Sequence, residues 1–215
     1  MSGRSPRWIH KISRGTSLGD MELGTLVKLN ENGTPADFYV ACHNYEAGLN
    51  GNGRTLLVRK DCYDMHVFSS SNNAYASSSL NAFLTGTYFN LLDASVREKA
   101  GTTKFYYTPG NKNNTVTTLE RAVFQLSVTE LGQTSRYSNT EGSALPIAST
   151  LQIAYRNGTA VDQWTRTPRR SNAASAFCLD SAGNVAGNSY LNSSGSRPAF
   201  TLPADTIVGD DLLIA

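Results

Sequence analysis

The chain has 215 residues and a formal net charge of +2, and 40% of its residues are hydrophobic. A chain of this length can bury one sizeable core. The small net charge argues against a nucleic-acid partner, and no apolar run reaches the roughly 18 residues of a membrane span. The 18 glycines and many Asn, Ser and Thr residues favour an α+β or mostly β fold over a helical bundle.

Residues 1–17 differ in character from the rest of the chain. Four basic residues and Trp8 precede the first acidic residue, Asp20; the basic residues are Arg4, Arg7, Lys11 and Arg14. The segment is either a disordered start or an arm that docks on a partner with Trp8 as its anchor. No apolar stretch typical of a secretory signal follows Met1. We expect residues 1–17 to be a basic N-terminal arm and residues 18–215 to be one domain.

The first part of this domain reads as strands. Residues 23–29 and 36–42 alternate in polarity on either side of the turn signal at residues 30–33, which predicts a β-hairpin. A Gly- and Asn-rich loop at residues 45–54 follows. The apolar segment Arg54–Arg59 then predicts a central strand.

Two short helices are predicted next. One contains residues 80–84 and is capped within the serine run 77–79, and the other is Ala94–Ala100, capped by Asp93 and ended by Gly101. The segment Thr103–Tyr107 looks extended, whereas residues 119–128 are ambiguous between strand and helix. Residues 69–74, 109–115 and 133–143 are polar loops, and residues 156–158 form a turn.

Residues that could carry catalysis or hold a metal are sparse. Cys42, Cys62 and Cys178 have no paired spacing, and the three histidines do not complete a zinc site. Cys42 and Cys62 read as core thiols, although a disulfide between them is an alternative. Asp61, Asp64 and His66 read as a solvated turn rather than a metal or acid–base cluster. We expect no enzyme activity, no cofactor and no metal.

The most distinctive signal lies near the C-terminus, where two motifs enclose a polar segment. Gln163-Trp164-Thr165-Arg166-Thr167-Pro168 comes before it, and Gly195-Ser196-Arg197-Pro198-Ala199-Phe200 closes it. Residues 169–196 between them are mainly Ser, Asn, Ala and Gly. Because linkers are rarely bounded so firmly at both ends, the pattern predicts a structured surface that displays variable side chains on a fixed frame. The predicted frame residues are Trp164, Arg166, Pro168, Arg197, Pro198 and Phe200, with the arginines in ion pairs or bonded to carbonyl groups.

These two motifs resemble W-x-R-[ST]-P and G-x-R-P-A-[FL] of phage- and prophage-encoded proteins with a C-type-lectin-like fold. The resemblance extends upstream to residues 24–28, 30–33, 56–63 and 80–84, and covers most of the chain. It implies an α+β, C-type-lectin-like single domain with short strands, two short helices and long loops.

The resemblance also implies which positions vary to bind a ligand. They are Arg169, Ser171, Asn172, Ala174, Ser175, Phe177, Cys178, Ala182, Asn184, Val185, Asn188, Tyr190, Asn192 and Ser194. In such proteins a retroelement often mutates adenines in Asn- or Tyr-type codons, which cannot produce Lys, Glu, Gln, Met or Trp. None of these five residue types occurs in residues 169–196.

The implied function is that of a phage virion protein, a tail-tip or fibre component that displays a variable face to a bacterial surface receptor, either protein or glycan. We expect it to assemble in the host bacterial cytoplasm, to dock on other virion proteins through its N-terminal arm, and to form a homo-oligomer. The alternatives are a head-decoration or head-fibre component without a receptor role, and a bacterial surface adhesin.

Overall fold

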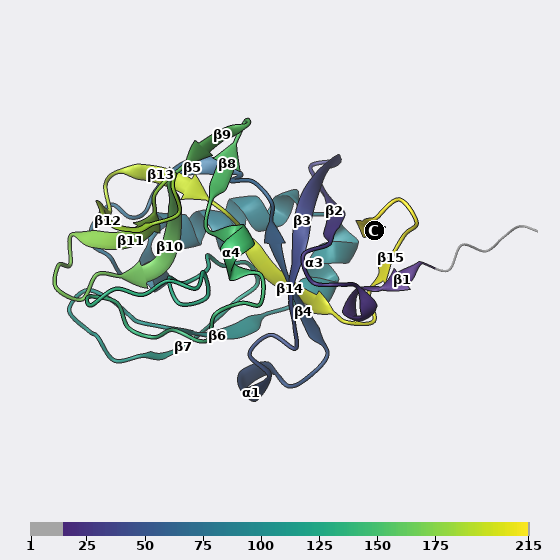
Figure 1. The fold of residues 1–215 in the computed structure, drawn as a ribbon, viewed down its shortest axis with the longest axis horizontal. Coiled ribbons are helices and arrows are strands. Elements are labelled where there is room, and N and C mark those ends of the chain that lie inside the picture. The colour runs from purple at the N-terminus through teal and green to yellow at the C-terminus, as the bar shows by residue number, and fades with distance from the viewer. Residues whose placement is uncertain (1–14, 215) are drawn as a thin grey trace, which may run out of the picture.

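The computed structural model describes residues 15–214, and strands dominate the fold (Figure 1). A continuous hydrophobic core includes side chains from Leu18 to Ile214. Residues 1–14 of the predicted arm lie outside the described residues. Within residues 15–214, no helix is long and apolar enough to cross a membrane.

One five-stranded sheet lies at the centre of the molecule. Its strands are β2 (Leu26–Glu31), β3 (Thr34–His43), β4 (Arg54–Arg59), β14 (Ala199–Pro203) and β16 (Leu213–Ile214). They lie in the order β14-β4-β3-β2-β16, antiparallel except for the parallel pair β16–β2. The predicted hairpin is confirmed as β2 and β3, whose turn residues Asn32 and Gly33 both have positive φ. The predicted central strand is β4, which β3 and β14 flank.

The second five-stranded sheet lies at the left of Figure 1 and contains the motif-bounded segment. Its strands are β5 (Asp64–Val67), β10 (Gln163–Pro168), β11 (Ser175–Leu179), β12 (Val185–Ser189) and β13 (Ser193–Ser196). The order is β12-β11-β10-β13-β5, and only the pair β10–β13 is parallel. Residues 169–196 are therefore ordered strands and loops.

Three two-stranded sheets complete the strand content of residues 15–214. They pair β1 (Thr16–Ser17) with β15 (Ile207–Val208), β6 (Thr103–Tyr107) with β7 (Thr117–Arg121), and β8 (Ala154–Arg156) with β9 (Thr159–Val161). The predicted turn at residues 156–158 joins β8 to β9. The ambiguous segment 119–128 resolves as the end of β7 followed by an irregular stretch.

The helices are short. The α-helices are α1 (Ala47–Asn50), α2 (Ser79–Ala82), α3 (Ala94–Ala100) and α4 (Ala148–Leu151). The 3₁₀ helices are η1 (Leu18–Asp20), η2 (Tyr75–Ser77) and η4 (Phe89–Leu91), and η3 (Phe83–Tyr88) is a π-helix that continues α2. Both predicted helices are present: Ser78 Oγ caps α2 by accepting from the backbone N–H of Asn81 at 3.0 Å, and α3 has the predicted bounds.

The predicted fold class is nevertheless wrong. The described chain is mostly β, with two five-stranded sheets and three two-stranded ones, and its longest α-helix has 7 residues. This arrangement does not match an α+β C-type-lectin-like domain. The prediction came from the motif resemblance, which rests on short stretches of sequence and does not determine how much of the chain pairs as strands.

Candidate ligand-binding surface

The frame residues on β10 and β14 are buried as the motifs predict. Trp164 is fully buried, packs edge-on against Phe68 with ring centroids 5.3 Å apart, and donates its indole N–H to the carbonyl of His66 at 2.7 Å. Phe200 is fully buried against Phe38. These aromatic contacts attach both motifs to one core.

Arg166 lies at the centre of a buried charged network. Its guanidinium makes two hydrogen bonds to Glu130, at 2.6 and 2.9 Å, and its Nε lies 3.9 Å from Glu141. Tyr45 also donates its hydroxyl to Glu130. Burial acts to lower the pKa of Arg166, but Glu130 and Tyr45 outweigh that effect and raise it. Burial also raises the pKa of Glu141, which Arg166 opposes. The predicted ion pair is therefore confirmed.

Arg197 instead binds carbonyl groups, the other predicted role. It donates to the backbone oxygens of Arg59, Lys60 and Leu151 at 2.7–2.8 Å. The motif requires glycine at position 195, because a Cβ there would lie 2.3 Å from Sγ of Cys62. The closing motif therefore fixes β13 by close packing and by hydrogen bonds to the backbone of the preceding elements.

The 14 predicted ligand-binding residues have unequal exposure. Phe177, Cys178 and Ser194 are buried at 3%, 1% and 0% exposure. Arg169, Ser175, Val185, Asn188 and Tyr190 are partly exposed, and Ser171, Asn172, Ala174, Ala182, Asn184 and Asn192 are exposed. The buried three do not reach a ligand at the surface, which corrects their assignment. Phe177 and Cys178 are adjacent residues of β11 and point to opposite faces of the sheet, so both faces of the sheet are covered at this strand.

The exposed positions also do not form one face. The β11–β12 hairpin turns at residues 180–184, so Ala182 and Asn184 lie at one end of these strands. Ser171, Asn172, Ala174 and Asn192 lie at the opposite end, about 16 Å away given the five residues of β11. Most of the predicted residues therefore belong to one end of the second sheet, and Ala182 and Asn184 do not.

Five loops from distant parts of the chain meet at that end, and we call them the five-loop surface. They are residues 69–73, 109–115, 133–139, 169–174 and 190–192. Hydrogen bonds join neighbouring loops: Ser69 N–H binds the carbonyl of Tyr190, Arg170 N–H binds the carbonyl of Tyr137, and Asn139 Nδ2 binds the carbonyl of Asn114. These bonds link loop 69–73 to loop 190–192, and loop 133–139 to loops 169–174 and 109–115.

Asn73 joins three of these loops, and no sequence pattern predicted this role. The side chain is 1% exposed, and its Nδ2 donates to the carbonyls of Arg169, Asn172 and Ser175 at 3.2, 3.1 and 2.7 Å. Its Oδ1 accepts from the backbone N–H of Asn111 at 2.8 Å. In the sequence, Asn73 ends a Ser- and Asn-rich run that looks like an ordinary surface loop, so no local signal marks its role.

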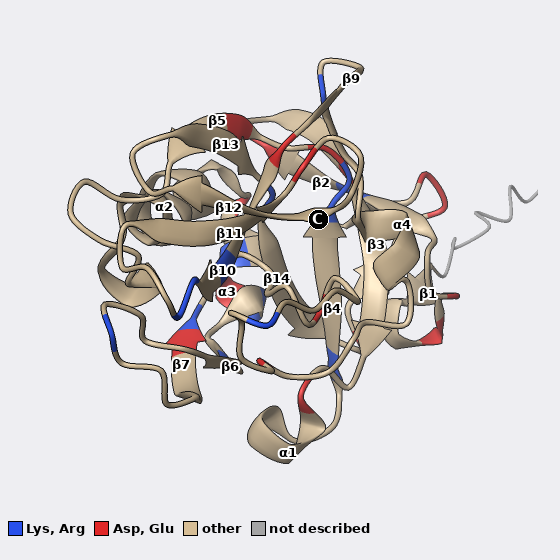
Figure 2. Ribbon diagram, turned by 60° about the vertical axis from the view of Figure 1, so that its left-hand side comes forward, with Lys and Arg blue, Asp and Glu red and all other residues tan. Residues whose placement is uncertain are grey.

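The charge of the five-loop surface is one-sided. Its loops contain Lys112, Arg136, Arg169 and Arg170 but no Asp or Glu. Elsewhere on the molecule, both basic and acidic residues are present (Figure 2). Some Asn side chains of the surface form hydrogen bonds within their own part of the chain. Asn172 Oδ1 accepts from the N–H of Ala174 at 2.9 Å, and Asn192 Nδ2 donates to Asn188 Oδ1 at 2.7 Å. The surface is thus polar, basic and internally hydrogen-bonded.

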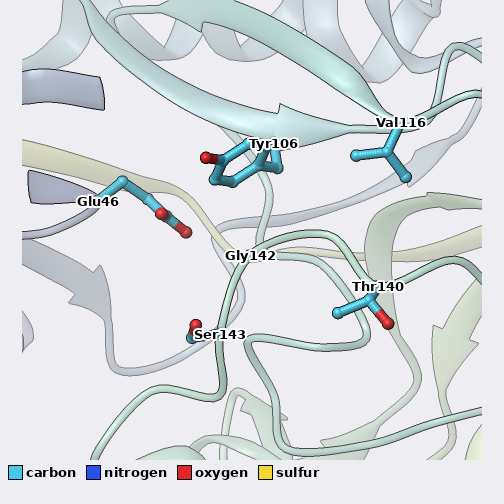
Figure 3. Close-up of a pocket in the computed structure, with 6 residues that line it drawn as sticks. All are labelled: Glu46, Tyr106, Val116, Thr140, Gly142 and Ser143. Carbon is cyan, nitrogen blue, oxygen red and sulfur yellow. The ribbon is translucent and has the colours of Figure 1, made fainter. Parts of the chain in front are cut away.

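A pocket of about 270 Å³ lies beside loops 109–115 and 133–139. Its lining residues are Glu46, Tyr106, Val116, Thr140, Gly142 and Ser143; Figure 3 shows Glu46 and Ser143 on the left and Val116 and Thr140 on the right. Burial and Glu130 raise the pKa of Glu46, and Arg166 opposes them. Gly142 has a φ of +85°, and a Cβ there would lie 2.4 Å from Oε1 of Glu46. The polar part of the lining is therefore one carboxylate together with the hydroxyl groups of Tyr106, Thr140 and Ser143.

The remaining polar cluster is built differently from the predicted turn. Asp64 and His66 lie in β5, where Asp64 pairs with Arg156 at 3.1 Å and His66 stacks on Phe83 with ring centroids 3.9 Å apart. Burial lowers the pKa of His66, and Asp64 opposes it. Among residues 15–214, no group of His, Cys, Asp and Glu is placed to hold a metal ion. All three cysteines are free, so Cys42 and Cys62 form no disulfide.

Comparison with known proteins places the frame and all five loops inside one family match. The model of a domain of unknown function, DUF6273, matches residues 52–204, which begin just before β4 and end just after β14. No curated protein and no solved structure matches the chain. Since the match covers well over half of the 215 residues, the chain belongs to the DUF6273 family.

Proposed function

We propose that this protein is a receptor-binding component of a bacteriophage particle, in the tail tip or a fibre, and that its five-loop surface contacts the bacterial cell. The observation that carries the proposal is the meeting of five polar loops on a rigid support, where Asn73 and the buried Arg166 network hold them. The motif resemblance to phage-encoded variable proteins supports the same function, although the fold that the resemblance implied is wrong.

The composition of the surface suits adaptable polar recognition. Ser, Asn and Gly supply hydrogen-bonding groups on short side chains, and partly exposed tyrosines at positions 137 and 190 add contact area, as in antibody loops. The loops are already joined by hydrogen bonds, so binding immobilises few additional groups. Single contacts of this kind are weak, and a particle that carries several copies gains avidity from them. We therefore propose a homo-oligomer in the virion.

The placement of the two ends of the molecule is consistent with this function. Strand β1, which contains the last two residues of the basic arm, lies at the right of Figure 1, whereas β11 and β12 lie at the left. The arm, residues 1–17, is thus proposed to attach the domain to another virion protein, with the five-loop surface directed away. A truncated protein that lacks residues 1–14 tests this, because it is expected to fold normally and to be lost from assembled particles.

Cell adsorption tests the receptor role directly. The surface variant changes five neutral polar or apolar residues to Ala: Ser70, Asn114, Ser171, Leu191 and Asn192. The control variant changes five exposed residues elsewhere to Ala: Asn52, Thr87, Ser95, Ser149 and Thr159. Wild type and control are expected to adsorb equally to a susceptible strain in a panel, and the surface variant to lose adsorption at an unchanged melting temperature. Equal adsorption by all three proteins, or none to any strain, contradicts the proposal.

A further inference from the structure

Three arginines gather around Tyr137 on the five-loop surface. The guanidinium carbon of Arg136 lies 4.5 Å from the centre of the Tyr137 ring, and that of Arg169 lies 5.0 Å from the same centre. Arg170 joins them because its N–H binds the carbonyl of Tyr137 at 3.0 Å and its Nη2 binds the carbonyl of Arg136 at 2.6 Å. Two loops, 133–139 and 169–174, therefore bring three positive charges to one place.

No negative charge balances this cluster. Across the part of the chain that the structure describes, the ion pairs join other residues, and no carboxylate pairs with Arg136, Arg169 or Arg170. Like charges gathered around one side chain repel one another, and an anion that binds between them reduces this repulsion. The Nε of Arg169 is also buried without a hydrogen-bond partner, which adds an unsatisfied donor to the same cluster.

We propose that Arg136, Arg169 and Arg170 bind a phosphate or carboxylate group of an anionic glycan polymer on the bacterial surface. A guanidinium that lies over an aromatic ring keeps N–H groups at its edge, where they donate in pairs to such an oxyanion. Asn73 holds the carbonyl of Arg169, so the backbone of one contributing loop is fixed before binding. The inference rests on the proposed receptor role and names the chemistry of the receptor.

A nucleic acid also presents phosphates, but the surface favours a glycan. Tight nucleic-acid binding uses about 6–10 phosphate contacts, and the five loops contain only Lys112 in addition to the three arginines. Tyr137, which could stack on a base, has guanidinium groups against its ring. Double-stranded DNA therefore enters the test as a competing ligand.

The test measures binding of the full-length protein to immobilised poly(glycerol phosphate), polygalacturonate, neutral dextran and double-stranded DNA. The variant carries Arg136→Gln and Arg170→Gln, both at exposed positions. The matched control removes two charges elsewhere with Lys28→Gln and Lys60→Gln. Arg169 is left unchanged because it packs beside Gly187.

Wild type and control are expected to bind at least one of the two anionic polymers, more weakly as salt is raised, and not to bind dextran. The variant is expected to bind about tenfold more weakly or worse, since it loses charge-assisted hydrogen bonds. Comparison of the two polymers separates phosphate from carboxylate recognition. No binding to either polymer, equal binding by all three proteins, or tighter binding to DNA overturns the inference.

Cell adsorption separates this inference from the receptor role itself. If wild type and the arginine variant adsorb equally and free polymer does not compete, the anion site is wrong and the receptor role stands. If polymer binding depends on the arginines but no strain adsorbs the protein, the receptor role is wrong and the anion site stands.

Discussion

Arg166 and Glu130 form a two-hydrogen-bond ion pair in which both side chains are fully buried. The pair connects β10 to the irregular stretch before the loop at residues 133–139. Arg166 also donates to the carbonyls of Tyr106 and Gln125 at 3.0 and 3.1 Å. One side chain thus fixes the strand that leads into the 169–174 loop and two of the chain segments around it.

Substitution of Arg166 by Met should leave Glu130 buried and unpaired. Removal of one partner from a buried ion pair usually costs about 3–5 kcal/mol, so we expect a loss of unfolding free energy in that range. Arg166→Lys should also destabilise the protein, because an ammonium cannot reproduce the paired hydrogen bonds. Urea denaturation measures both losses, and a loss below about 1 kcal/mol for Arg166→Met would show that the network does not support the fold.

Trp164→Ala should cost roughly 3–5 kcal/mol through the cavity it leaves against Phe68. Asn184→Ala and Asn192→Ala should each change stability by only about 0.5 kcal/mol, because both side chains are exposed. Thermal melts of the three variants measure the difference. Equal losses at all three positions would mean that the frame and the displayed residues have been confused.

Asn73→Ala should loosen the five-loop surface more than it disturbs the core. The substitution removes three hydrogen bonds to carbonyls of residues 169–175, at about 0.5–1.5 kcal/mol each. Hydrogen exchange at residues 170–175 is expected to accelerate, whereas exchange in β3 and β4 stays slow. Asn114→Ala, in a neighbouring loop, is the control and should leave exchange in residues 170–175 unchanged. If exchange in Asn73→Ala is also unchanged, Asn73 does not hold this loop in place.

Glu46→Gln should stabilise the protein at neutral pH. The pKa of Glu46 is raised by burial and by Glu130, so the folded state holds a proton more tightly than the unfolded state does. Stability of the wild type therefore falls as pH rises through the window above the ordinary glutamate pKa of about 4.3. The Gln variant lacks this fall, so its advantage in melting temperature at pH 7 should shrink as pH approaches 4.

The control for this pH series is Glu98→Gln, an exposed carboxylate on α3. It is expected to follow the wild type at every pH. A Glu46→Gln variant whose advantage grows toward low pH would show that the sign of the pKa shift is wrong.

Elements that are determined by neighbouring residues in the chain, such as hairpins and capped helices, could be predicted from the sequence. The β2–β3 hairpin alternates in polarity around a turn with Asn32 and Gly33, and Ala94–Ala100 has its cap and its terminating Gly101, so both follow from the sequence. In contrast, Ser193–Ser196 reads Ser-Ser-Gly-Ser and becomes a strand only because β5 and β10 supply partners for its backbone. The fold class was wrong because it was taken from the motif resemblance, and short motifs do not determine how much of the chain pairs as strands.

The candidate surface is predictable only in part. The two motifs marked the frame correctly, because Trp, Arg and Pro in fixed order signal packing and buried hydrogen bonds. Which residues of 169–196 reach solvent depends on what packs against each face of the sheet, so Phe177 was wrongly assigned to the exposed surface. Arg136 and Asn73 were missed because their importance comes from contacts with residues 30 or more positions away.

The ends of the described chain have a consequence for biosynthesis. Strand β16 pairs with β2 and strand β15 pairs with β1, so each of the last two strands of the described chain pairs with one of its first two. The ribosome releases these partners almost a whole chain length apart. Pairings with such large sequence separation form slowly, and until they form, the edge of β2 stays open to other chains. The period between the synthesis of β2 and its pairing with β16, at the concentrations reached during overexpression, is therefore the stage at which this edge is most exposed to aggregation.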